Sequence, residues 1–72
     1  MLFDAELQNE LATRLHSKIK DLVIAKVYVA FQEDESLYVH IIKNGIDFEY
    51  IINDIPTRFN RGESLDDFAK AV

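Results

Sequence analysis

The side chains best suited to chemistry in this sequence are a histidine and a glutamate in its middle, His40 and Glu49. An imidazole and a carboxylate that face each other can act as a general acid–base pair near neutral pH. Catalysis also requires a pocket that excludes water and a nucleophile or an orienting group, and the neighbouring residues indicate neither. We therefore interpret the two as an exposed ion pair. We predict a protein that is not an enzyme, with no catalytic residues.

Metal and cofactor chemistry also lack a matching motif. The chain has no cysteine, which excludes disulfides and thiolate zinc sites. Glu33, Asp34 and Glu35 do not have the spacing of an EF-hand loop, and Gly45 and Gly62 do not belong to a glycine-rich phosphate loop. The sequence therefore predicts no metal site and no cofactor.

The strand pair that must position His40 and Glu49 is predicted from its turn. Asn44-Gly45 is the preferred dipeptide of a two-residue type I′ turn, and strand-like runs at residues 37–43 and 46–52 flank it. The turn fixes the register, so the expected pairs on one face are Lys43 with Ile46, Ile41 with Phe48, Val39 with Tyr50 and Leu37 with Ile52. The expected pairs on the other face are Ile42 with Asp47, His40 with Glu49 and Tyr38 with Ile51.

A further strand is predicted over residues 22–32, because β-branched and aromatic residues are frequent there. Pairing Phe31 with Leu37 places Tyr28 in the same row as His40 and Glu49. The mixed face of the sheet is our candidate interaction surface, and it comprises Lys26, Tyr28, Tyr38, His40, Glu49 and Ile51. Three interpretations are open: an ordinary solvated face, a protein interface, where tyrosine is enriched, or a platform for stacked bases.

Two helices are predicted, one at each end of the chain. Residues 4–20 carry an apolar residue at every fourth position, with Asp4 as the N-cap and His16 facing solvent. Residues 53–63 form a loop that leaves the sheet at Pro56. Ser64 then caps a second helix, with Asp67 as its capping-box partner. Its apolar pattern still runs at Val72, so we expect this last helix to be truncated there or to fray.

These elements predict a single α+β domain over residues 1–72. The expected order is α-β-β-β-α, with the strands in a three-stranded antiparallel meander and both helices packed on one face. The covered face is expected to carry Val27, Val29, Val39, Ile41, Phe48 and Tyr50.

Two further features suggest contacts with other molecules. The first predicted strand is a long apolar edge whose only charged residue is Lys26. Such an edge is either covered by another part of the protein or pairs with another chain, in a homodimer or with a partner. Arg58 and Arg61 flank Phe59 in the predicted loop and form a candidate anion contact. The alternative is that Phe59 anchors the loop while both arginines face solvent.

Composition limits the class of partner. The 72 residues include 13 acidic and 8 basic side chains, for a net charge of −5. That balance makes nucleic acid an unlikely partner, since phosphate binding needs a basic face. No run reaches the roughly 18 apolar residues of a membrane span, and the start lacks the pattern of a signal peptide. We therefore expect an intracellular, cytoplasmic protein with no membrane contact.

The predicted order of elements resembles that of the double-stranded RNA-binding domain, in topology. That family contacts phosphates with basic residues in its first β-turn and at the start of its last helix. The corresponding segments here, residues 32–36 and 63–67, are both acidic, so the function is not carried over. Residues 50–59 and the short, acidic, cysteine-free chain resemble small uncharacterised proteins encoded by phages and mobile elements of Gram-positive bacteria.

Taken together, these features favour a small protein-interaction module with an accessory or regulatory role. Its partner is expected to be another protein, met through the candidate interaction surface or the first-strand edge. The alternative is a nucleic-acid-binding module of double-stranded-RNA-binding-like topology, in which Tyr28, Tyr38 and His40 stack bases while Lys26, Arg58 and Arg61 contact phosphates.

Overall fold

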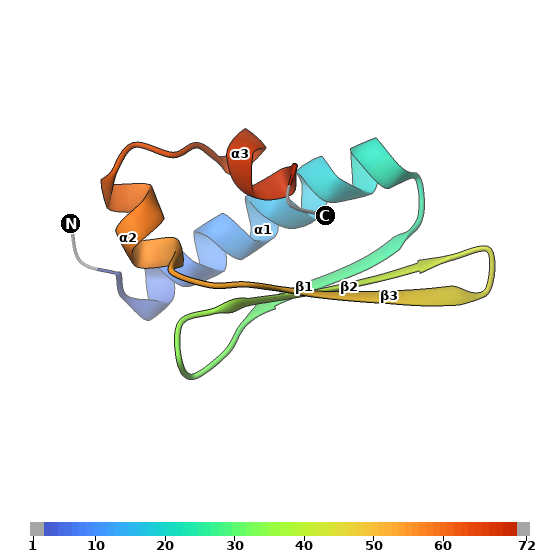
Figure 1. Ribbon diagram of the computed structural model, residues 1–72, viewed down its shortest axis with the longest axis horizontal. Coiled ribbons are helices and arrows are strands. Elements are labelled where there is room, and N and C mark those ends of the chain that lie inside the picture. Colours follow the sequence, from blue (N-terminus) through green and yellow to red (C-terminus); the bar gives the residue numbers. More distant parts are fainter. Residues whose placement is uncertain (1–2, 71–72) are drawn as a thin grey trace.

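Three antiparallel strands form a meander, and three helices lie on one face of it (Figure 1). The structure is a computed structural model that describes residues 3–70. Its elements in chain order are α1 (Ala5–Val23), β1 (Lys26–Phe31), β2 (Leu37–Lys43), β3 (Ile46–Ile52), α2 (Ile55–Asn60) and α3 (Leu65–Ala69). The predicted α+β class, the antiparallel meander and the placement of helices on a single face are confirmed.

The register of the sheet is the predicted one. Asn44 and Gly45 both have positive φ, 54° and 75°, as a type I′ turn requires. Lys43 pairs with Ile46 and His40 with Glu49 across β2 and β3. Across β1 and β2, Phe31 pairs with Leu37 and therefore Tyr28 with His40.

Helix α1 begins as predicted but ends three residues later than residue 20. The Asp4 carboxylate accepts a hydrogen bond from the Leu7 amide at 2.9 Å and caps the N-terminus. Val23 extends the buried stripe of Leu15 and Ile19 by one more turn, so packing prolongs the helix. The first strand consequently begins at Lys26, and its predicted start at residue 22 is wrong.

Residues 53–63 contain a helix where a loop was predicted. Helix α2 starts just after Asp54, with Pro56 in its first turn, where proline fits because those amides have no helical partner. Ile55 is fully buried and Phe59, one helical turn later, packs against the core. Pro56 thus marks both the exit from the sheet and the start of α2.

Helix α3 has the predicted N-terminus. The Ser64 amide donates to the Asp67 carboxylate at 2.8 Å, and the Asp67 amide donates to the Ser64 hydroxyl at 3.3 Å. Both halves of the capping box are present. The expected continuation to Val72 lies outside the described residues.

The core lies between the sheet and the helices, and it is concentrated under α1 and α3. Its buried members are Leu15, Ile19, Val27, Leu37, Val39, Ile41, Ile52, Ile55, Phe68 and Ala69. The burial of β3 is uneven, because Ile52 at its far end belongs to the core while Ile46 at its hairpin end is 56% exposed. Phe48, predicted to be covered, is 41% exposed, and Tyr50 is only half-buried.

His16 is not the solvent-facing residue that the helical pattern predicted. It lies half-buried beside β1, and its Nε2 group donates to the carbonyl oxygen of Val27 at 2.8 Å. An edge carbonyl of the sheet is satisfied in this way by a side chain of α1. The prediction was wrong because helical periodicity shows only that His16 lies off the apolar stripe. It does not show that β1 runs alongside this part of α1.

Candidate interaction surface

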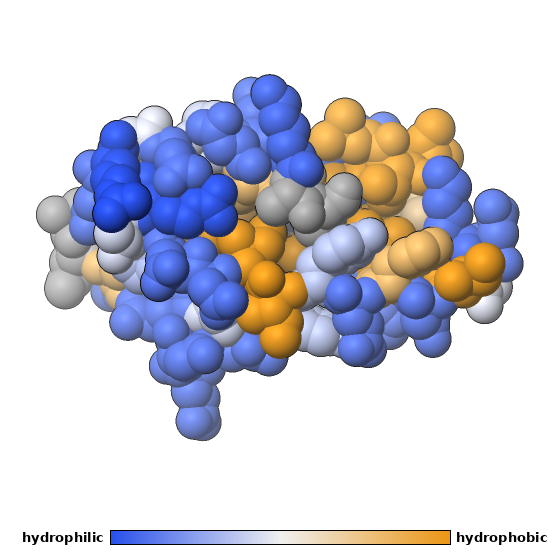
Figure 2. All heavy atoms as spheres, viewed as in Figure 1, coloured by the Kyte–Doolittle hydropathy of each residue, from blue (hydrophilic) through white to orange (hydrophobic). Residues whose placement is uncertain are grey.

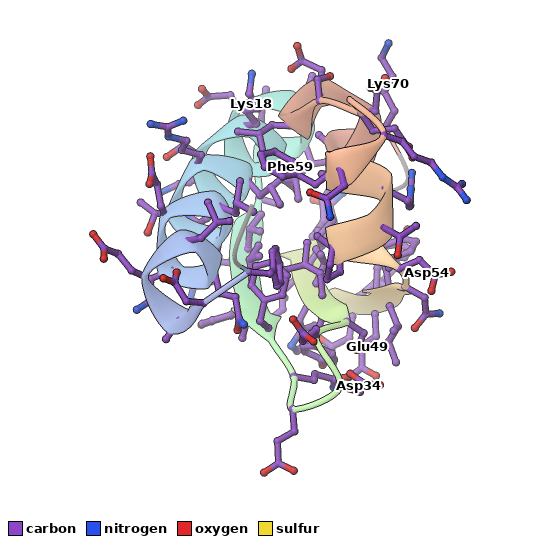
Figure 3. All side chains as sticks on the ribbon, turned by 90° about the vertical axis from the view of Figure 1, so that its left-hand side faces the viewer. Lys18, Asp34, Glu49, Asp54, Phe59 and Lys70 are labelled. Carbon is purple, nitrogen blue, oxygen red and sulfur yellow. The ribbon has the colours of Figure 1, made fainter. Side chains whose placement is uncertain are left out.

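The candidate interaction surface occupies the face of the sheet that no described helix covers. All three helices lie on the opposite face, as Figure 1 shows. Because alternate residues of a strand point to opposite faces, the six predicted residues share this uncovered face. Tyr28 is 56% exposed and Ile51 58%. Figure 3 shows Glu49 on the side of the sheet away from the helices, whereas Phe59 lies among them.

Three aromatic rings form the centre of this surface. The ring centroids of Tyr28 and His40, which are paired across β1 and β2, lie 5.9 Å apart. Those of Tyr38 and His40, two residues apart on β2, lie 6.2 Å apart in an edge-to-face arrangement. These distances are in the range at which aromatic pairs attract each other. The result is a contiguous aromatic cluster, Tyr28–His40–Tyr38, in which Tyr28 is exposed and Tyr38 and His40 are half-buried.

Carboxylates on β3 flank the aromatic cluster and pair with it diagonally. The Tyr38 hydroxyl donates to Glu49 Oε1 at 2.9 Å. His40 Nε2 lies 3.5 Å from Asp47 Oδ1 and makes no hydrogen bond within the described residues. His40 and Glu49 are opposite in register, but the predicted ion pair between them is replaced by these diagonal contacts. Diagonal neighbours lie farther apart than directly opposite residues, but they remain within reach of aromatic side chains such as these.

The hydrogen bond to Glu49 also affects the acidity of Tyr38. It stabilises the neutral phenol and raises the pKa of Tyr38 above the usual value of 10.0. Partial desolvation and the negative charges of Glu49 and Asp47 act in the same direction. Tyr38 is therefore a neutral donor at physiological pH, with its hydroxyl held in a fixed direction.

The two arginines of the predicted anion contact lie in α2 or next to it, away from the candidate interaction surface. Arg58 binds the Glu63 carboxylate with Nε at 2.9 Å and Nη2 at 2.8 Å. Its guanidinium also lies 5.0 Å from the ring centroid of Phe68. The hydrogen bond to Glu63 is the largest cause of the raised pKa of Arg58. Arg58 thus braces α2 against α3, while Arg61 is exposed.

An apolar hollow that the sequence did not predict lies at the hairpin end of the molecule. It is lined by Val23, Ile41, Lys43, Phe48 and Tyr50, with a volume of about 150 Å³. Leu22 and Ile46 are exposed nearby, 67% and 56% respectively. Figure 2 shows hydrophobic residues over the C-terminal end of α1 and at the tip of the β2–β3 hairpin. The sequence did not indicate this surface, because α1 was predicted to end at residue 20, before Leu22 and Val23.

The groups on this surface are chemically mixed. Ring faces, a directed phenol, two carboxylates and one ammonium group lie on an open sheet. Within residues 3–70, no three histidine, aspartate or glutamate side chains converge as a metal site would require. None of the helices described is long and apolar enough to cross a lipid bilayer. No protein-family model matches the chain, and comparisons with curated proteins and with solved structures found no significant match.

Proposed function

We propose that this protein is a small, non-catalytic interaction module that binds another protein through its candidate interaction surface. The observation that carries the proposal is the Tyr28–His40–Tyr38 cluster on a sheet face that no described helix covers, with Tyr28 exposed and Tyr38 and His40 half-buried. Tyrosine contributes large contact area at little cost in conformational entropy, so exposed tyrosines are frequent in binding sites. Ile51 adds an exposed apolar contact at the edge of the same surface.

The charges of this surface favour a partner with a basic region. Asp47 and Glu49 flank the aromatic cluster on one side, and Lys26 lies on the other. The whole chain carries a net charge of −5, which also favours association with a positively charged protein. The proposal includes an accessory or regulatory role in the cytoplasm, which rests on the acidic, cysteine-free composition.

Nucleic-acid binding is the second candidate, and the aromatic cluster supports it, because bases stack on exposed tyrosine and histidine rings. The placement of charges weakens this candidate. Arg58 is engaged by Glu63, and α2 lies on the helical side of the sheet, so this arginine cannot serve the same surface. The carboxylates of Asp47 and Glu49 contact His40 and Tyr38, so they would repel phosphates near a base stacked on these rings.

Site-specific photo-crosslinking in the native host distinguishes the two candidates. A benzophenone amino acid replaces Tyr28 in one variant and Ile51 in another, since both side chains are exposed. A matched control carries it at Asn60, an exposed residue of α2 on the helical side. We expect adducts of one discrete size from Tyr28 and Ile51 but not from Asn60, and we expect nuclease to leave these adducts unchanged.

Adducts that nuclease removes would replace the proposal with the nucleic-acid candidate. Equal adducts from all three positions, or adducts from Asn60 alone, would contradict binding at the candidate interaction surface. A Tyr38→Ala change in the Tyr28 crosslinking variant should reduce the adduct, because it removes a neighbouring ring and the phenol that binds Glu49.

A further inference from the structure

We propose that the outer edge of β3 receives an extended segment of the partner as a fourth strand, and that this segment alternates basic and apolar side chains. The inference rests on the proposed function, because it specifies how and with what chemistry a protein partner is bound. Strand addition supplies affinity through main-chain hydrogen bonds, and the alternating side chains supply specificity.

The register shows which backbone groups of β3 are free. In a two-residue hairpin the residues flanking the turn, Lys43 and Ile46, form a hydrogen-bonded pair. Every second residue of β3 from Ile46 onward therefore bonds to β2. The amides and carbonyls of Asp47, Glu49 and Ile51 point away from β2 to the open edge, and no described group hydrogen-bonds to them.

The opposite edge of the sheet is less accessible. The Gln32 amide bonds to the Ser36 carbonyl at 2.8 Å, which fixes the hydrogen-bonding pattern of β1. By that pattern the amides and carbonyls of Val27, Val29 and Phe31 point outward. The Val27 carbonyl already accepts from His16, and α1 packs along β1. A strand added there must displace this contact, which makes β3 the better edge and disfavours the predicted homodimer through β1.

The side chains of β3 define the chemistry of the added strand. Asp47 and Glu49 project from the outer face. A positively charged residue of the added strand would therefore form a favourable pair opposite either of them. Ile46 and Phe48 project from the inner face, where they are exposed beside the apolar hollow. An apolar residue opposite Phe48 would cover it. Basic and apolar positions must alternate, because neighbouring residues of a strand face opposite sides.

A second copy of this chain does not meet these requirements. The register that pairs all seven residues of β3 with β3 of another copy sets Glu49 directly against Glu49. Two carboxylates in that position repel each other. The charged edge thus acts against self-association and selects a partner of opposite charge.

The test uses a synthetic peptide that is as long as β3 and alternates Lys with Val. It is titrated into the isotope-labelled protein, with amide shifts, amide exchange and light scattering as readouts. We expect slowed exchange at Asp47, Glu49 and Ile51 and unchanged exchange at Val27 and Val29. A peptide with the same residues in separate Lys and Val blocks should not protect the β3 amides, nor should one alternating Glu with Val.

Backbone methylation distinguishes strand addition from simple charge attraction. In antiparallel addition the basic residues, opposite Asp47 and Glu49, bond to β3 through their own amides. Methylating the central Lys amide should therefore abolish protection, whereas methylating the neighbouring Val amide should preserve it. The reverse result would indicate parallel addition and would still support the proposal. Equal binding by both methylated peptides would overturn it.

Charge variants supply the matched control. Asp47→Lys should weaken peptide binding at least about tenfold, while Glu33→Lys, the same change in the β1–β2 turn, should alter it little. Equal losses of peptide affinity in the two variants would show that only net charge matters, and this result would overturn the proposal. Slow exchange of the β3 amides through self-association, without any peptide, would also overturn it.

If no peptide binds but the Tyr28 photo-crosslink still yields a protein adduct, strand addition is wrong and the proposed function stands. If the crosslink also fails, the proposed function fails as well.

Discussion

The hydrogen bond from Tyr38 to Glu49 fixes the direction of one hydroxyl group on the candidate interaction surface. It spans β2 and β3 and aligns the phenol with the flanking carboxylates. The register does not identify this partner by itself, because a side chain as long as tyrosine can also reach the diagonal neighbour, which lies farther away than the opposite residue.

Replacing Glu49 with glutamine should lower the pKa of Tyr38 back toward 10.0. The glutamine oxygen still accepts a hydrogen bond, but it lacks the charge that strengthens the bond and opposes phenolate formation. The measurement is an NMR titration of the Tyr38 ring resonances in both proteins. A pKa of Tyr38 that is the same in the variant as in the parent would show that Glu49 does not set it.

Ile24 ends α1 in a conformation that is unfavourable for a β-branched residue. Its φ of 49° lies in the left-handed region, and its side chain is 85% exposed. Asparagine adopts this conformation more readily. We expect Ile24→Asn to raise the free energy of unfolding by about 0.5–1 kcal/mol in urea denaturation.

Ile24→Val is the matched control, because valine is also β-branched and keeps the unfavourable conformation. It should leave stability within about 0.5 kcal/mol of the parent. A gain in the valine variant, or a loss in the asparagine variant, would contradict the assignment of strain to Ile24.

Among the secondary-structure elements, the boundaries that could be predicted from the sequence are those that local residue chemistry alone determines. Asn44-Gly45 determines both the turn and the register, and Ser64 with Asp67 determines where α3 begins. The end of α1 could not be predicted in this way, because Leu22 and Val23 suit a strand as well as a helix. Val23 packs against the core, and this contact favours the helical conformation. The contact cannot be recognised from the sequence.

The capping box should make the stability of α3 depend on pH. Hydrogen bonds from the Ser64 amide and hydroxyl hold the pKa of Asp67 below its usual value of 3.8. A carboxylate with a lowered pKa stabilises the folded state fully above 3.8, and this stabilisation is lost as the pH falls through the lower, folded-state pKa.

Asp67→Asn should remove this part of the acid sensitivity. Urea unfolding at neutral and at acid pH should show a smaller drop in stability for the variant than for the parent. Asp66→Asn provides the control, since Asp66 forms no part of the capping box. If the Asp67 variant shows the same acid-induced loss as the parent, the capping box does not contribute as described.

At the scale of the whole molecule, the stability of this small chain depends on a few large side chains. Phe68 is fully buried between α3, α1 and the sheet. Phe68→Ala should cost about 3–5 kcal/mol. That loss is comparable with the entire stability of a domain this small, at about 0.05–0.15 kcal/mol per residue. Urea or thermal denaturation followed by circular dichroism would measure it.

Phe48→Ala is the matched control for Phe68. Phe48 lies in β3 and is 41% exposed, so its removal should cost about 1 kcal/mol. Similar losses for both variants would mean that β3 is covered more fully than described.

The candidate interaction surface was predicted from the sequence residue by residue, since a two-residue period places its members on one face. The availability of β3 could not be predicted in the same way. It depends on helices that cover the Ile52 end of β3 but leave its hairpin half, with Ile46 and Phe48, exposed, which is a property of the tertiary arrangement. The engagement of Arg58 by Glu63 is likewise a contact between α2 and the segment after it, and no pattern in the sequence indicates it.

The most direct test of the central claim is an amide-shift titration of the isotope-labelled protein with the purified partner identified through the Tyr28 crosslink. The account predicts that the largest shifts fall on Lys26, Tyr28, Tyr38, His40, Glu49 and Ile51, with little change in α1, α2 and α3. Shifts concentrated on the helices, with those six amides unchanged, would contradict it.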